Sequence, residues 1–249
     1  LKFFKIDKGL EIHHDGDLPA RSGLGSSSAF TVGMLNCLHA LKGRMVSKTD
    51  LAKQAIRVER DILKENVGSQ DQVAVACGGF NKIVFHNDHN FKIEPITLEK
   101  GRLALLQKQL LLVYTGLSRF ATDIAKEQIE NTPHKNSELL AMQQMVDYAI
   151  EILNSRRDIN EFGKLLHESW QLKRNLSGKI TNATIDALYK TALKSGAVGG
   201  KLLGAGGGGF MLLFAPPERQ KIIKEKLRKF LDVNFAFEGE GSRIIYYNP

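Results

Sequence analysis

The 249-residue sequence has no long apolar run, no paired cysteines and no leader of the secretory type. No stretch approaches the ~20 consecutive apolar residues that a membrane-spanning helix needs, and Leu1–Leu10 lacks the charged-then-apolar layout of a signal peptide. Only two cysteines occur, Cys37 and Cys77, and neither belongs to a CxxC pair, so we expect no zinc site or disulfide framework. Both are predicted to be small core residues, and the cytoplasm is the expected location.

Signatures of nucleic-acid binding are also missing, although the net charge is +8. A positive field attracts nucleic acids, anionic surfaces and phosphorylated small molecules alike. The densest basic run, Lys221–Lys229, carries apolar residues at helical spacing and predicts an amphipathic helix with a solvated basic face. The sequence contains no zinc finger, RNA-binding aromatic signature or basic zipper. We therefore expect anionic metabolites as ligands, and neither a nucleic-acid nor a membrane partner.

Hydrophobic periodicity and turn residues predict an α+β protein in which strands and helices alternate. Ser47-Lys48-Thr49-Asp50 has the pattern of a capping box that opens a helix, and Gly78-Gly79 breaks the chain before a strand pair. The switch to helices near Leu110 predicts two domains, 1–109 and 110–249. The predicted strands are 10–14, 80–85, 91–96, 110–114, 210–214, 233–237 and 244–247, and the predicted helices are 29–41, 47–64, 119–130, 138–154, 160–176, 184–194 and 216–231.

A glycine- and serine-rich segment, Pro19–Ala29, lies between a predicted strand and a predicted helix that is apolar on most sides. The first N–H groups of a helix have no hydrogen-bond acceptor within the helix, and the helix dipole places partial positive charge at the same end. A phosphate can accept hydrogen bonds from these groups and is attracted by this charge. Gly23 and Gly25 can adopt positive φ angles, and the hydroxyls of Ser26–Ser28 can meet phosphate oxygens or Mg²⁺. The alternative is a serine N-cap that follows a flexible turn.

Two carboxylates follow this segment. Glu59 falls late on the second predicted helix, and Asp71 comes after a short turn. Transfer of a γ-phosphoryl group needs cations that neutralise charge, and a carboxylate that orients or deprotonates the attacking hydroxyl. The alternatives are an exposed helical carboxylate for Glu59 and, for Asp71, a residue stabilised by the dipole at the start of a helix.

A second glycine-rich segment, Gly199–Phe210, precedes an apolar strand. Glycines in this number destabilise regular structure, so a compensating role for the flexible backbone is expected. A tight crossing beside a bound ligand is one explanation, and a glycine hinge is the other.

Taken together, these segments resemble the GHMP kinases, the superfamily of galactokinase, homoserine kinase and mevalonate kinase. Pro19–Ala29 is similar to the second motif of the family, which is not a Walker A loop, and Gly199–Phe210 is similar to the third. The interval from Glu59 to Asp71 resembles the spacing of the metal-binding glutamate and catalytic aspartate in galactokinase-like members. The first motif has no counterpart before Leu1, so we expect that the natural N-terminal portion is absent from this sequence.

The resemblance implies the GHMP kinase fold, with an N-terminal α/β domain like domain 2 of ribosomal protein S5, incomplete here, and a C-terminal ferredoxin-like α+β domain. It implies ATP and Mg²⁺ as cofactors, with Asp71 as the catalytic base or orienting group, and Ser27 and Glu59 as Mg²⁺ ligands. Substrate contacts are implied for Asp71, Arg119 and Gly207, where the alternative for Arg119 is a surface arginine. The implied nucleotide-binding residues are Pro19, Ser22, Gly23, Leu24, Gly25, Ser26, Ser27, Ser28, Gly206 and Gly207.

Within the superfamily, the segments 70–72, 78–81 and 114–116, followed by Arg119, resemble the sugar kinases that act on D-glycero-D-manno-heptose 7-phosphate. The fucose kinases show a similar pattern. The implied reaction is ATP-dependent phosphorylation of the anomeric hydroxyl, for nucleotide-activated heptose and surface polysaccharide. The alternatives are a kinase for fucose, galactose or another small alcohol, and a catalytically silent nucleotide and sugar sensor. The implied partner is a small sugar or sugar phosphate, and a homodimer is also allowed.

Overall fold

The computed structural model of the chain describes residues 1–17, 23–86, 90–117 and 121–248, without the side chains of residues 121–123. Its contacts divide the chain into two compact units. Unit 1 comprises the described parts of Leu1–Ala20, Gly25–Gly79 and Gly239–Pro249, and unit 2 those of Arg21–Leu24 and Phe80–Glu238. The domain boundary predicted between residues 109 and 110 stays a prediction.

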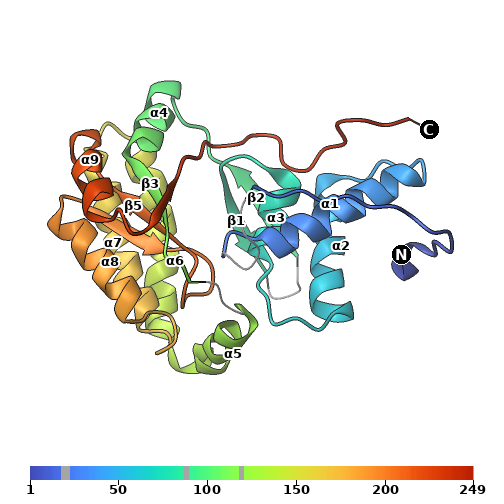
Figure 1. Cartoon of the computed structure of the whole chain (residues 1–249), viewed down its shortest axis with the longest axis horizontal. Coiled ribbons are helices and arrows are strands. Elements are labelled where there is room, and N and C mark those ends of the chain that lie inside the picture. Colours follow the sequence, from blue (N-terminus) through green and yellow to red (C-terminus); the bar gives the residue numbers. More distant parts are fainter. Residues whose placement is uncertain (18–22, 87–89, 118–120, 249) are drawn as a thin grey trace. The chain divides into compact units, whose positions relative to one another are not determined.

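Unit 1 is helical in its described residues (Figure 1). Its helices α1 (Ser26–Leu41), α2 (Lys48–Arg57) and α3 (Gln70–Cys77) pack against one another, and α2 continues into a π-helical turn, η2 (Val58–Ile62). A short 3-10 helix, η1 (Lys2–Phe4), precedes them. Small and branched side chains fill the shared core, and the alanines among them let the helices approach closely. These residues are Val32, Leu35, Leu38, Leu51, Ala52, Ala55, Val73 and Ala76.

The C-terminal segment returns to unit 1. The Ser242 backbone N–H donates to the Val75 carbonyl (2.9 Å), and Asn36 Nδ2 donates to the Ser242 hydroxyl (3.1 Å). The backbones of Gly78 and Gly241 are in direct contact, and both glycines have positive φ angles, 65° and 66°. A side chain on either glycine would meet the other backbone, so Gly78 is needed for this close approach as well as for the break in the chain.

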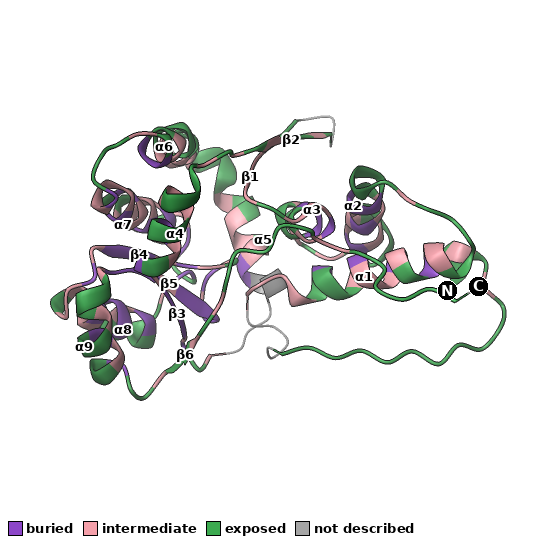
Figure 2. Cartoon of the chain, turned by 90° about the horizontal axis from the view of Figure 1, so that it is seen from above, coloured by how far each residue is buried: buried purple, intermediate pink, exposed green. Residues whose placement is uncertain are grey.

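Unit 2 is built on a four-stranded antiparallel sheet, whose strands are labelled in Figure 2. The strand order is β4 (Gly199–Leu202), β5 (Phe210–Phe214), β3 (Leu110–Tyr114) and β6 (Leu231–Val233). Among the described residues, four α-helices and one short 3-10 helix lie between β3 and β4, and one α-helix lies between β5 and β6. This βαββαβ order is that of the ferredoxin-like domain that was predicted. The elements are β1 (Asn81–Phe85), β2 (Phe91–Pro95), α4 (Lys100–Gln109), β3 (Leu110–Tyr114), α5 (Ala121–Asn131), η3 (Thr132–His134), α6 (Asn136–Asn154), α7 (Asn160–Arg174), α8 (Ala183–Lys194), β4 (Gly199–Leu202), β5 (Phe210–Phe214), α9 (Pro217–Lys226) and β6 (Leu231–Val233).

The two faces of this sheet pack against different sets of helices, and α7 contributes to both. Leu111 and Leu213 belong to the cluster that packs with α8 and α9, whereas Phe214, with its side chain on the other face, packs with α4, α6 and α7. Figure 2 shows the central strands as buried and the outer sides of the helices as exposed. The central strands β3 and β5 therefore read as continuous apolar runs, because both of their faces are covered.

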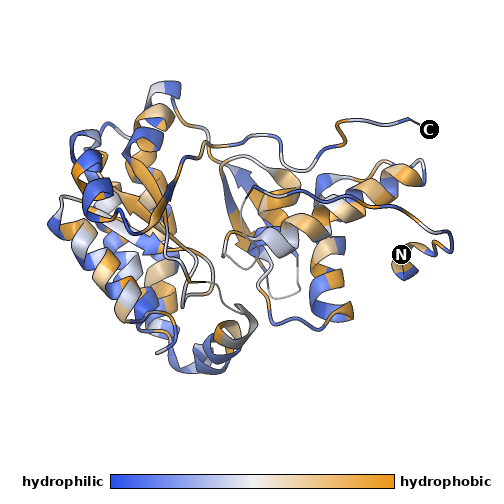
Figure 3. Cartoon of the chain, in the orientation of Figure 1, coloured by the Kyte–Doolittle hydropathy of each residue, from blue (hydrophilic) through white to orange (hydrophobic). Residues whose placement is uncertain are grey.

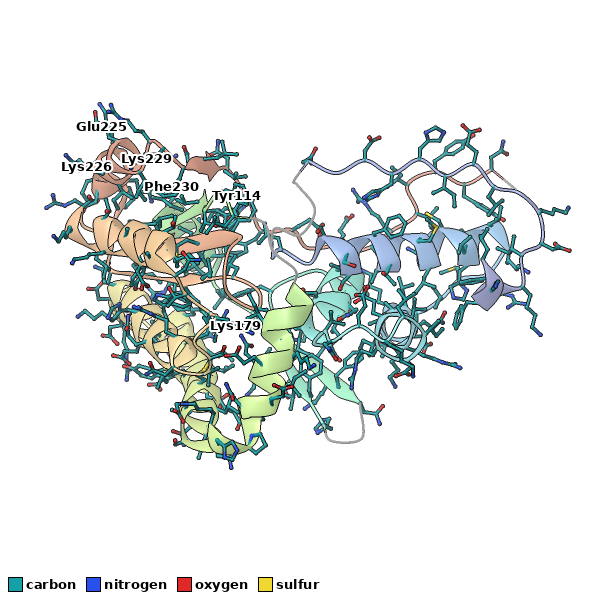
Figure 4. The ribbon with its side chains drawn as sticks, turned by 60° about the horizontal axis from the view of Figure 1, so that its bottom comes forward. Tyr114, Lys179, Glu225, Lys226, Lys229 and Phe230 are labelled. Carbon is teal, nitrogen blue, oxygen red and sulfur yellow. The ribbon has the colours of Figure 1, made fainter. Side chains whose placement is uncertain are left out.

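Most predicted elements are confirmed. The strands 110–114 and 210–214 have the predicted bounds, and 80–85 and 91–96 form an antiparallel hairpin, β1 and β2. The Ser47 hydroxyl accepts a hydrogen bond from the Asp50 N–H (3.0 Å), as a capping box requires. Ile223 on α9 and Leu227 just after it are buried, while Lys226 at the end of α9 and Lys229 beyond it are exposed (Figure 4). This confirms the predicted solvated basic face, although the helix ends at Lys226. Within the described residues, no helix is both long and apolar enough to cross a bilayer.

Three predicted strands are wrong. Residues 10–14 and 244–247 are not strands, because neither segment has a hydrogen-bonded strand partner among the described residues; Ile12 is 47% exposed and Ile245 85% exposed. The strand predicted over 233–237 instead covers Leu231–Val233. Beyond it, the Gln107 side chain binds the backbone, because its Nε2 donates to the Phe235 carbonyl (2.9 Å) and its Oε1 accepts from the Phe237 N–H (3.1 Å).

Helix α1 is less buried than its composition predicts. It is apolar around most of its surface (Figure 3), yet Phe30 is 43% exposed and Leu41 57% exposed. Cys37 is exposed as well, so the prediction that both cysteines are core residues is wrong for this one. The reason is that α2 and α3 cover only one side of α1, the side of Val32, Leu35 and Leu38.

Candidate active site

The glycine- and serine-rich loop leads directly into α1. Gly23 and Gly25 have φ angles of 81° and 71°, which confirms the predicted positive values. Gly25 is the N-cap, and no side chain caps the helix, so the alternative of a serine N-cap is wrong. The first intrahelical bond runs from the Ala29 N–H to the Gly25 carbonyl (2.8 Å). The N–H groups of Ser26–Ser28 therefore lie before the first helical hydrogen bond, where a phosphate would need donors.

Asp71 lies against this helix start. It is the second residue of α3, and a Cβ added to Gly25 would lie 3.1 Å from both Cβ and Cγ of Asp71. The pKa of the Asp71 carboxyl is raised above its usual value, first by partial desolvation and second by the negative charge of Glu59. Water still reaches the residue, which is exposed. Asp71 also lies in the first turn of α3, where the alternative of a carboxylate stabilised by the helix dipole places it.

Glu59 is buried, with only 1% of its surface exposed, so the alternative of an exposed helical carboxylate is wrong. It lies in η2, which continues α2. The Ser28 hydroxyl donates to Glu59 Oε2 (3.0 Å), and Gln72 Nε2 donates to the same oxygen. Hydrogen bonds from α1 and α3 thus converge on one carboxylate in the core of unit 1.

The residues around Glu59 fit a magnesium ion. Glu59 Oε1 is buried and has no hydrogen-bond partner in the described structure, which is costly for a carboxylate oxygen unless another group compensates it. Mg²⁺ is usually held by one or two carboxylates together with phosphate and water oxygens. Among the residues that the structure describes, no group of three or more His, Cys, Asp or Glu side chains is arranged to hold a metal.

Ser28, rather than the predicted ligand Ser27, contacts Glu59. Ser27 is exposed on α1, and its carbonyl accepts a hydrogen bond from the Thr31 hydroxyl (3.2 Å). The role of Ser27 as a metal ligand stays a prediction.

The second glycine-rich segment begins as a strand. Gly199 and Gly200 belong to β4, so these two lie in regular structure despite the destabilising effect expected of the glycines. The reason lies in packing, because α7 approaches β4 so closely that a side chain on Gly199 would collide with the Gly163 carbonyl. A Cβ on Gly200 would lie 2.7 Å from the Leu212 carbonyl oxygen.

The turn that follows β4 is a packed crossing rather than an open hinge. The Gly207 N–H donates to the Ile180 carbonyl (2.7 Å), and the Gly209 N–H donates to the Leu117 carbonyl (2.9 Å). A Cβ on Gly206 would lie 2.7 Å from Ile180 Cα. Contacts inside unit 2 therefore explain much of the glycine content of this turn.

Sequence reasoning missed Lys173, which anchors the same turn. This lysine is 8% exposed, and its Nζ donates to the carbonyls of Leu202 (2.9 Å) and Gly204 (2.5 Å). Gln128 also donates to the Ala205 carbonyl. A basic residue in the last turn of a helix is ordinary, so no signal in the sequence distinguishes Lys173 from a solvated lysine.

The structure brings together part of the predicted site. Gly25, Ser28, Glu59 and Asp71 meet in unit 1. Pro19, Ser22 and Arg119 lie outside the described residues. The predicted ligand contacts of Gly23, Leu24, Ser26, Gly206 and Gly207 stay predictions.

The chain was compared with known proteins. Residues 1–79 match the GHMP kinases N terminal domain, and residues 145–233 match GHMP kinases C terminal. A D-glycero-alpha-D-manno-heptose 7-phosphate kinase from Campylobacter jejuni is 31% identical over 243 residues, which cover 96% of this chain and 71% of the relative.

Two solved structures are similar in fold. A putative sugar kinase from Campylobacter jejuni has a TM-score of 0.67 at 28% identity, covering 90% of this chain and 65% of that one. A D-glycero-D-manno-heptose 1-phosphate kinase from Bacteroides thetaiotaomicron has a TM-score of 0.69 at 23% identity, covering 90% and 64%. The chain thus spans slightly less than two thirds of the length of these two proteins. Both domain matches and the Campylobacter relative agree with the motifs, so the chain belongs to the GHMP kinase family, as its sequence predicts.

Proposed function

We propose that the protein is an ATP-dependent kinase that phosphorylates the anomeric hydroxyl of D-glycero-D-manno-heptose 7-phosphate. The observation that carries the proposal is the contact between Asp71 and Gly25 at the uncapped start of α1. Glu59 is held beside the same helix by Ser28. A base, a cation ligand and backbone phosphate donors therefore share one helix end within unit 1. The similarity to the Campylobacter heptose 7-phosphate kinase supports the choice of acceptor.

Each group has a chemical task in this reaction. The N–H groups of Ser26–Ser28 donate to phosphate oxygens of ATP at the positive end of the α1 dipole. Asp71 accepts the proton of the attacking hydroxyl, whose oxygen bonds to the γ-phosphorus while the bond to the bridging oxygen of ADP breaks. Partial desolvation raises the pKa of the Asp71 carboxyl, which makes it a stronger base than an ordinary carboxylate. Glu59 and Ser27 would hold Mg²⁺, which neutralises charge on the phosphate oxygens when it is bound.

The product of this reaction is a sugar bisphosphate with one phosphate at the anomeric carbon. Such a compound suits a route to nucleotide-activated heptose for surface polysaccharide. Fucose, galactose or another small alcohol is the alternative acceptor. A silent sensor that binds nucleotide and sugar is a further alternative, but the placement of both Glu59 and Asp71 argues against it, because a pure binder needs no base.

Turnover assays distinguish these functions. The purified protein with Mg²⁺ and ATP should release ADP with heptose 7-phosphate, and more slowly or not at all with fucose and galactose. Asp71→Ala should lower kcat by about 10²- to 10⁴-fold, the usual contribution of a general base, and should still bind nucleotide. Full activity of Asp71→Ala would overturn the role of Asp71. Binding of nucleotide and sugar with no turnover of any acceptor would favour the sensor.

A further inference from the structure

Ser28 and Gln72 both donate hydrogen bonds to the same oxygen of Glu59, so the two carboxylate oxygens differ in the number of hydrogen bonds they accept. Oε2 accepts two hydrogen bonds, from Ser28 Oγ on α1 and from Gln72 Nε2 on α3. Oε1 accepts none in the described structure. All three side chains are buried, with exposed fractions of 5% for Ser28, 0% for Gln72 and 1% for Glu59.

The amide of Gln72 can face Glu59 in only one orientation. If its carbonyl oxygen faced the carboxylate, two acceptors would meet without a hydrogen atom between them. With Nε2 toward Glu59, the Oε1 of Gln72 is also buried and has no partner among the described residues. Two acceptor oxygens without donors lie in the same buried cluster. A hard cation is the chemical group that oxygen atoms of this kind bind.

We propose that Ser28 and Gln72 are positioning residues that hold Glu59 so that its Oε1 is the oxygen presented to Mg²⁺. The inference rests on the proposed function, which makes Glu59 a cation ligand. The two donors occupy Oε2 and prevent the carboxylate from turning that oxygen outward. These two hydrogen bonds fix the orientation of the carboxylate before a cation binds, as hydrogen bonds to metal-ligating side chains generally do.

Direct binding of Mn²⁺, used as a paramagnetic substitute for Mg²⁺, tests the proposal without an activity assay. Free Mn²⁺ would be measured by electron paramagnetic resonance in the presence of ADP. Gln72→Leu should weaken Mn²⁺ binding by about 10- to 100-fold, the usual effect of removing such an outer contact. Ser28→Ala should also weaken Mn²⁺ binding, because each of the two substitutions removes one of the two donors to Oε2. Gln54→Leu is the matched control, since Gln54 Oε1 forms a hydrogen bond with His39 Nε2 (2.8 Å) in the same unit and Gln54 is not one of the donors to Glu59.

Glu59→Gln separates this inference from the proposed function. If Glu59→Gln binds Mn²⁺ as the wild type does, Glu59 is not a cation ligand and the proposed site fails. If Glu59→Gln loses Mn²⁺ while Gln72→Leu and Ser28→Ala bind it normally, the proposed site stands and the positioning inference is wrong. Thermal unfolding in the presence of a chelator shows whether each variant folds. Should Gln72→Leu not fold, the Ser28→Ala measurement decides.

Discussion

Replacing Gly25 by alanine should impair phosphoryl transfer by more than the accompanying loss of stability explains. Gly25 has a φ of +71°, and a residue with a Cβ costs about 1–2 kcal/mol in this left-handed region. Reduced freedom of the unfolded chain offsets about 0.4–1 kcal/mol of that cost. The net destabilisation from the backbone alone is therefore about 1 kcal/mol.

The added methyl group also meets the predicted base. It would lie 3.1 Å from Cβ and Cγ of Asp71 and 3.2 Å from its Oδ2, closer than the usual ~3.5–4.0 Å separation of nonbonded carbon atoms. Asp71 must therefore move by roughly a few tenths of an ångström. Because a displacement of about 1 Å can cost about 10²-fold in rate, we expect kcat to fall by roughly threefold to tenfold.

Gly43 provides the matched control. It too has a positive φ, +63°, and lies in unit 1, but a Cβ there would meet only the Tyr247 hydroxyl, at 4.0 Å. Gly43→Ala should therefore destabilise the protein by a similar amount and leave kcat unchanged. Thermal unfolding and steady-state turnover of heptose 7-phosphate would be measured for both variants. Equal kcat values for Gly25→Ala and Gly43→Ala would refute the coupling of Gly25 to Asp71.

Two further predictions concern Asp71 and Lys173. Because its pKa is raised in the folded state, Asp71 binds a proton more readily there than in the unfolded chain, so its contribution to stability falls as the pH rises from 3.8 through the raised value. Asp71→Asn should remove this part of the pH dependence in urea unfolding and stabilise the protein at neutral pH, and an unchanged profile would contradict the raised pKa. Lys173→Met should cost about 1–3 kcal/mol, because the Leu202 and Gly204 carbonyls lose their donor. It should also raise KM for ATP more than it lowers kcat, and an unaltered KM would show that the turn does not contact the nucleotide.

Sequence patterns predict some strands correctly and others wrongly, and the difference is whether the segment has a neighbouring strand to pair with. Residues 110–114 and 210–214 are strands with the predicted bounds, since each is a short apolar run that pairs in the sheet of unit 2. Residues 10–14 and 244–247 have comparable strand patterns and are not strands. Alternation of side chains shows that a segment could cover a hydrophobic face, but only a neighbouring strand can satisfy its backbone groups.

Within the candidate site, the family motifs identified Glu59 and Asp71, whereas the residues that hold Glu59 could not be predicted. Ser27 and Ser28 are adjacent in sequence, but on a helix they point about 100° apart. Which of them reaches Glu59 depends on how α1 is rotated against α2, and the core residues Val32, Leu35 and Leu38 determine that rotation. The sequence shows Gln72 only as part of a motif, because its contact with Glu59 depends on how α3 packs.

The glycines of the two glycine-rich segments have different physical causes. In the segment Gly199–Phe210, Gly199, Gly206 and Gly208 each lie against backbone or side-chain atoms of unit 2, so packing alone requires them. A ligand is not needed to explain these three positions. Gly25 differs, because the atoms nearest to its missing side chain are those of a carboxylate with a raised pKa. Substitutions of Gly25 at the start of α1, of Asp71 and of Glu59 therefore test the proposed function most directly.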